Sequence, residues 1–139
     1  MNGKASTITP GNTMRMSTPW TAVILYSLTI MMNWLYAYLV QSQPAIIMNS
    51  WTVVFPLMSY FYLSFSGISV VGIYQRTCWG FCLGYITIFS GAVTCAISYL
   101  LAFHFYPEIF DYFILILVLN FAVVVYMVAY YQNNPMNPD

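Results

Sequence analysis

Long runs of apolar residues, separated by short polar stretches, dominate the chain. Four runs, at residues 20–40, 51–73, 79–103 and 109–131, are each near the ~20 residues that a helix needs to cross a hydrocarbon core. None of them alternates apolar and polar residues with the period of two that is typical of membrane barrel strands. Backbone groups in lipid must be hydrogen-bonded within the protein, which favours helices here. The pattern therefore predicts an all-α fold with four transmembrane helices.

The polar stretches divide the chain into a leader, a helical domain and a tail. The leader covers residues 1–18, the helical domain 19–131 and the Asn- and Pro-rich tail 132–139. Pro19 suits the first turn of a helix, where its missing N–H costs nothing. The second apolar stretch is longer than one span requires, and Pro56 within it predicts a tilt or a bend.

The composition excludes several classes of protein. Apolar residues make up 61% of the chain and charged residues only 4%, whereas soluble domains carry about a quarter charged residues. Nucleic-acid binding needs clustered Lys and Arg, and a net charge of zero excludes that partner. The lipid bilayer is the solvent that remains, so we expect an integral, multi-pass membrane protein.

The few cations predict how the chain is oriented. Lys4 and Arg15 precede the first span, Arg76 lies between the second and third, and the other two connections contain no Lys or Arg. Positive residues stay on the cytoplasmic side of a membrane. We therefore expect an up-down four-helix bundle with both termini in the cytoplasm.

Small residues form two strips at helical spacing. The strip on the third span comprises Gly80, Gly84, Thr87, Gly91, Thr94 or Cys95, Ser98 and Ala102. The strip on the second span comprises Ser64, Gly67 or Ser66, Ser69 and Gly72. Small side chains let helix backbones approach closely in lipid. The simpler interpretation is that the second and third spans pack together through these strips, and the alternative is that they dock another subunit.

Two amides, Asn33 and Asn120, lie deep in the first and fourth spans. Each needs a partner, because an unpaired amide is costly in hydrocarbon. An interhelical hydrogen bond is the simpler interpretation, and a polar lining for a substrate or pigment is the other. Asp, Glu, Lys, Arg and His are absent from the centre of every predicted span, which disfavours proton-coupled transport and voltage sensing.

The segment of residues 104–111, around the start of the fourth span, holds the only His and two of the three carboxylates, as His104, Glu108 and Asp111. One interpretation is a partial Zn²⁺ or Cu²⁺ site on the outer face, completed by another chain. The other is capping, because Pro107 suits a first helical turn and carboxylates are stabilised at the positive end of a helix. One histidine excludes a bis-His haem held by this chain alone.

The three cysteines do not form a metal or redox motif. Cys78 lies beside Arg76 at the expected cytoplasmic edge, where it is a candidate for S-palmitoylation. Cys82 and Cys95 are expected to be buried as small apolar residues.

These features favour a small, non-catalytic membrane subunit that packs against other transmembrane chains as a scaffold or accessory component. The aromatic surface would also suit contact with a lipid, a quinone or a pigment. An alternative is a homo-oligomeric channel or carrier for small or apolar solutes, lined by Asn33, Asn120 and the hydroxyl-bearing faces of the second and third spans. A further alternative is an enzyme subunit that contributes the outer-face metal ligands.

Overall fold

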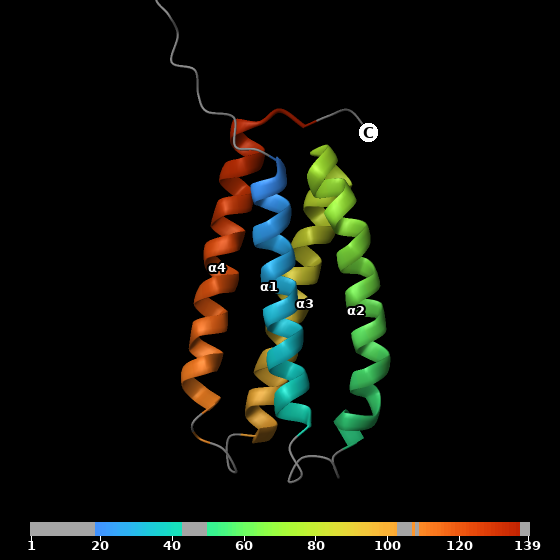
Figure 1. Ribbon diagram of the computed structural model, residues 1–139, viewed down its shortest axis with the longest axis vertical. Coiled ribbons are helices and arrows are strands. Elements are labelled where there is room, and N and C mark those ends of the chain that lie inside the picture. The colour runs from blue at the N-terminus through green and yellow to red at the C-terminus, as the bar shows by residue number, and fades with distance from the viewer. Residues whose placement is uncertain (1–18, 43–49, 103–106, 108, 137–139) are drawn as a thin grey trace, which may run out of the picture.

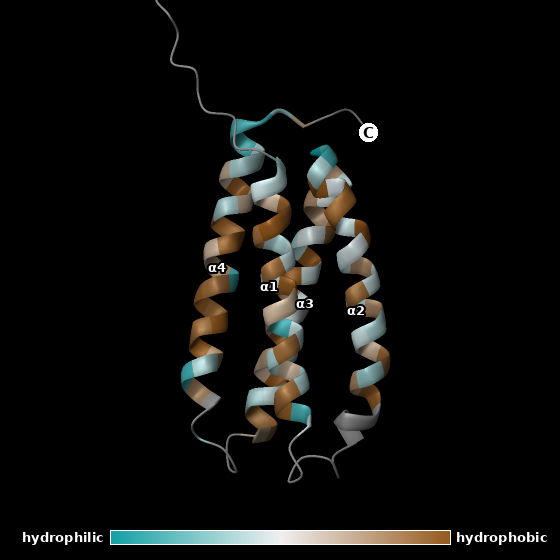
Figure 2. Cartoon of the chain, in the orientation of Figure 1, coloured by the Kyte–Doolittle hydropathy of each residue, from teal (hydrophilic) through white to brown (hydrophobic). Residues whose placement is uncertain are grey.

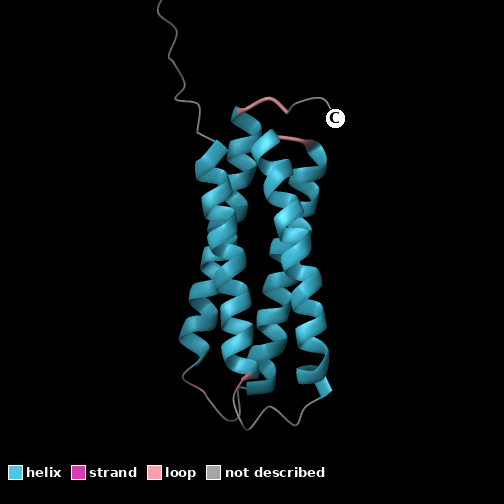
Figure 3. Ribbon diagram, turned by 45° about the vertical axis from the view of Figure 1, so that its right-hand side comes forward, coloured by secondary structure: helices cyan, strands magenta, loops and turns pink. Residues whose placement is uncertain are grey.

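The computed structural model of the protein describes residues 19–42, 50–102, 107 and 109–136. These residues form four helices: α1 (Pro19–Gln41), α2 (Ser50–Gln75), α3 (Cys78–Ala102) and α4 (Ile109–Asn133). The helices lie side by side along the long axis of the molecule (Figure 1). Every regular element in the described ranges is helical (Figure 3), so the prediction of an all-α fold with four long helices is confirmed.

All four helices are long and apolar enough to cross a membrane. Their candidate spans contain 23, 22, 25 and 24 residues in chain order, against the ~20 that a bilayer core requires. Hydrophobic residues recur along the whole length of each helix, and the most hydrophilic ones lie near the helix ends and, in α1 and α4, also partway along the helix (Figure 2). Large apolar side chains also cover much of the outer surface, as expected when lipid surrounds a protein. These properties fit an integral, multi-pass membrane protein.

Two helices lie at the centre of the bundle and two at its flanks. Both α1 and α3 pack closely against the three other helices, whereas the backbones of α2 and α4, in their described parts, do not come near each other. The flanking helices are consequently the least covered: 17% of the α2 span and 22% of the α4 span are buried, against 44% for α1. Most of the α2 and α4 surface therefore faces outward.

The contacts between helices also give their relative directions. Tyr26 of α1 lies against Gly84 of α3, and Gln41, further along α1, bonds Ser98, further along α3. The two central helices therefore run in the same direction. Helices α1 and α4 run in opposite directions. Asn33 of α1 contacts Asn120 of α4, whereas Tyr36, further along α1, contacts Phe113, which comes earlier in α4.

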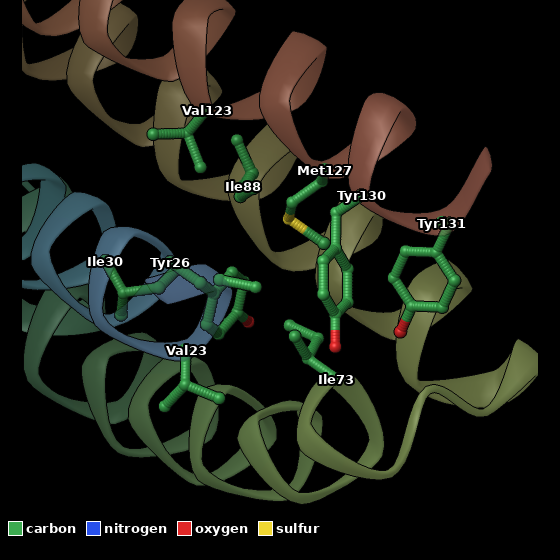
Figure 4. Close-up of a cluster of buried hydrophobic side chains, with 10 residues drawn as sticks. Val23, Tyr26, Ile30, Ile73, Ile88, Val123, Met127, Tyr130 and Tyr131 are labelled. Carbon is green, nitrogen blue, oxygen red and sulfur yellow. The ribbon is translucent and has the colours of Figure 1, made fainter. Parts of the chain in front are cut away.

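Two apolar clusters fill the interior. In the larger one, residues of all four helices point into the same space, among them Tyr26, Ile73, Ile88 and Met127 (Figure 4). The smaller cluster lies toward the other end of the bundle and comprises Tyr36, Val40, Cys95, Ala102 and Ile116. Burial of these side chains removes internal voids, which favours close helix packing through dispersion contacts.

A tight turn joins α2 to α3. The N–H of Thr77 donates to the carbonyl of Gly72 at 3.0 Å and the N–H of Arg76 donates to that of Ile73 at 3.2 Å. This pair of bonds is the Schellman arrangement, in which one residue takes a left-handed conformation. Arg76 takes it here, with φ of 58°. The Thr77 hydroxyl then accepts from the N–H of Gly80 at 3.2 Å and so caps α3.

Candidate functional site

The most distinctive polar feature is a pair of asparagines in the interior of the bundle. Nδ2 of Asn33 donates to Oδ1 of Asn120, and Nδ2 of Asn120 donates to Oδ1 of Asn33, each at 2.8 Å. Their side chains are 1% and 5% exposed. Asn120 uses its second N–H on the carbonyl of Ile116, at 2.7 Å. The structure thus brings together the two amides that the sequence singled out, from α1 and α4.

Helix α3 contributes a thiol to the same polar centre. The thiol of Cys95 lies 3.4 Å from the backbone oxygen of Asn33 and 3.7 Å from Oδ1 of the same residue, and it donates to them. Cys95 is fully buried, as expected, whereas Cys82 is exposed. The expectation that Cys82 is buried is therefore wrong. Its position on the helix directs it outward, because the buried face of α3 follows the glycine strip.

Gly91 makes room for polar groups from two neighbouring helices. A Cβ atom at this position would lie 2.8 Å from Nδ2 of Asn33 and would overlap the Tyr62 hydroxyl. The backbone of α3 therefore approaches α1 and α2 at the level of the asparagine pair. Tyr62 was not singled out from the sequence, because one tyrosine among the 13 in the chain carries no signal of depth or partner.

A second interhelical bond lies nearer the end of α1. Nε2 of Gln41 donates to the hydroxyl of Ser98 at 3.2 Å, and both side chains are buried. The first apolar run ends at residue 40, which predicts Gln41 to be in the polar connection that follows, but the structure places it in the last turn of α1. A polar glutamine at the end of an apolar run predicts a loop residue, because the sequence does not reveal a hydrogen-bond partner on another helix.

The glycines of α2 and α3 differ in where they lie. Gly72 and Gly80 meet backbone to backbone, and a Cβ on Gly72 would also lie 2.7 Å from the ring of Trp79. At Gly84, a Cβ would lie 3.2 Å from both Ile73 and Met127. Gly67 is different, because it is exposed and a Cβ there would meet nothing within 4 Å. Gly72, Gly80 and Gly84 thus allow close packing inside the bundle, and Gly67 faces outward.

The remaining candidate residues lie near the ends of the helices. Asp111 is exposed in the first turn of α4, while His104 and Glu108 lie outside the described residues. Among the residues that are described, no group of three or more His, Cys, Asp or Glu side chains could hold a metal ion. Cys78 is exposed at the first position of α3, two residues after Arg76.

The arrangement is an uncharged polar centre that links helices. Comparison of the chain with protein-family models, with curated proteins and with solved structures found no match.

Proposed function

We propose that this chain is a small, non-catalytic membrane subunit that packs against another transmembrane chain through the outer face of α2. One observation carries the proposal: Gly67 lies on the exposed side of a flanking helix and has open space beside it. Glycine lets the backbone of a second helix approach closely, and lipid-facing helices associate through such small residues.

The neighbours of Gly67 extend this feature into a stripe. Residues at helical steps of four and three share one face of a helix, and on α2 these are Tyr60, Ser64, Gly67 and Val71, all exposed. Two small residues therefore lie between two large ones. The resulting notch suits one turn of a neighbouring helix.

A second part of the proposal is the orientation of the bundle in the membrane. We propose that the bundle crosses the bilayer up-down, with both chain ends and the α2–α3 turn on the cytoplasmic side. The cation Arg76 in that turn supports this orientation, since positive residues favour the cytoplasmic face.

The test is a substitution that alters the notch and leaves the bundle intact. Gly67→Leu adds a side chain where the protein has no neighbouring atoms. Ala122→Leu is the matched control, because Ala122 is also small and exposed but lies on α4. The wild-type chain and both variants are extracted from their native membrane in mild detergent, and their assemblies are weighed by native mass spectrometry.

We expect the wild-type chain and the Ala122→Leu variant to retain a second transmembrane chain, and Gly67→Leu to lose it. Circular dichroism should show the same helix content in all three proteins. A wild-type chain that runs as a solitary monomer would count against the proposal, as would a Gly67→Leu variant that keeps its partner.

The alternative of a channel lined by Asn33 and Asn120 has less support. The two amides bond each other inside a single chain and are buried, so their polar atoms are directed at one another. Flux of small solutes into liposomes that contain the purified chain distinguishes the two functions. Flux that Asn120→Leu abolishes would favour the channel.

A further inference from the structure

A small cavity, partly open toward the outer surface, lies between α1, α2 and α3, beside the asparagine pair. Its volume is about 20 Å³, and its walls include Asn33, Trp34, Ser59, Tyr62, Gly91 and Thr94. A buried water molecule requires about 10–15 Å³ by the same measure and two to four polar partners. The cavity therefore has the size of one water molecule.

Two side chains that line the cavity carry a hydrogen-bond donor with no acceptor in the described part of the protein. The hydroxyl of Tyr62 and Nε1 of Trp34 are both buried, and neither donates a hydrogen bond within the described part of the chain. A phenol can donate its proton and an indole N–H can only donate. Unpaired polar groups of this kind are costly in apolar surroundings. A hydrogen-bond acceptor bound in the cavity would remove that cost.

The asparagine pair lies against the same wall. One N–H of Asn33 is used by Asn120, and its amide nitrogen and the Tyr62 hydroxyl both lie against Gly91. Because Gly91 has no side chain, the two polar groups converge there and leave room beside them. Polar side chains from both α1 and α2 therefore line the cavity.

The cavity also provides acceptors. Ser59 donates its hydroxyl proton to the carbonyl of Phe55 at 2.8 Å, and Thr94 donates to that of Ser90 at 2.9 Å. Both hydroxyl oxygens keep lone pairs that can accept a hydrogen bond. A water molecule, unlike the carbonyl of a lipid, can both accept from the donors and donate to these oxygens.

We propose that this cavity is a binding site for a single water molecule, held between α1, α2 and α3 at the level of the asparagine pair. The water accepts from Tyr62 and from Trp34 or Asn33, and it donates to both Ser59 and Thr94. It thereby provides a polar link between α2 and the central helices, where the α2 residues Ser59, Ser66 and Ser69 donate to carbonyls of their own helix.

The experiment measures magnetisation transfer from water to the indole N–H of Trp34 by NMR. The full chain is labelled with ¹⁵N-tryptophan and placed in nanodiscs made from deuterated lipid. The sequence contains four tryptophans, so the loss of one signal in Trp34→Phe assigns the resonance. We expect direct transfer from water to Trp34 in the wild-type protein.

Conservative variants separate a bound water from general hydration. Tyr62→Phe removes one partner of the water and Thr94→Val removes another, and we expect each to lose most of the transfer at Trp34. Tyr60→Phe is the matched control, because Tyr60 is on the same helix but 75% exposed, and it should leave the transfer unchanged.

Three results would overturn the proposal. The first is no transfer from water to Trp34 in the wild-type protein, which would mean a dry cavity. The second is transfer that Tyr62→Phe and Thr94→Val leave unchanged although both variants keep the wild-type helix content. The third is transfer from lipid protons in place of water when protonated lipid is used, which would identify a lipid group as the occupant.

Discussion

Gly72 of α2 and Gly80 of α3 meet so closely that a Cβ atom on either would overlap the backbone of the other. This contact follows directly from the turn that joins the two helices, in which Thr77 bonds both residues: it donates to the Gly72 carbonyl and accepts from the Gly80 N–H. The crossing of α2 and α3 is therefore set by two glycines and one threonine.

The first prediction concerns this crossing. Gly80→Ala should lower the free energy of unfolding by roughly 1–3 kcal/mol, the usual cost of overpacking, because two backbones must separate to admit the methyl group. Gly67→Ala is the control on α2, where a Cβ meets nothing. It should be neutral or stabilising, by up to about 1 kcal/mol, since glycine weakens a helix interior. Reversible unfolding in mixed micelles measures both, and equal effects would contradict the prediction.

The second prediction concerns the asparagine pair. Asn33→Leu and Asn120→Leu should each destabilise the protein, because each leaves the other amide without its partner. The double variant should cost less than the sum of the two. Membrane double-mutant cycles indicate a coupling of about 0.6 kcal/mol and at most about 1.7 kcal/mol. Strictly additive effects in the cycle would show that the two amides do not stabilise each other.

The third prediction concerns the cap of α3. Thr77→Val keeps the shape of the side chain but removes the hydroxyl that accepts from Gly80, and it should cost about 1 kcal/mol in the free energy of unfolding. Thr77→Ser retains the hydroxyl and should remain close to wild type. If both variants lower the free energy of unfolding equally, the Thr77 hydroxyl does not stabilise the protein as predicted.

The fourth prediction concerns orientation. In a chain whose three native cysteines are replaced by serine, a membrane-impermeant thiol reagent added from the cytoplasmic side should label a cysteine introduced at Gln132 and one introduced at Gln75, if the proposed topology holds. Both residues are exposed near helix ends. Ser42 is exposed just after the C-terminal end of α1, away from the proposed cytoplasmic side. A cysteine introduced there should react only with reagent added from the non-cytoplasmic side. Labelling of residues 132 and 75 from opposite faces would contradict the proposed topology.

The four long helices could be predicted from the sequence because hydropathy is a local property. A stretch of about 20 apolar residues must satisfy its own backbone in lipid, whatever surrounds it. The candidate polar residues were also visible locally, since Asn33 and Asn120 stand out in apolar surroundings. Neither conclusion requires knowledge of a neighbouring helix.

Only the tertiary structure decided which face of each helix is inward. In a soluble helix the apolar stripe marks the core, but in a membrane the outer face is as apolar as the interior. For that reason the sequence could not separate the outward Gly67 from the buried Gly72, or the exposed Cys82 from the buried Cys95. It also could not anticipate Gln41 bonded to Ser98, or Tyr62 beside Gly91, because such partners depend on how helices far apart in the chain pack together.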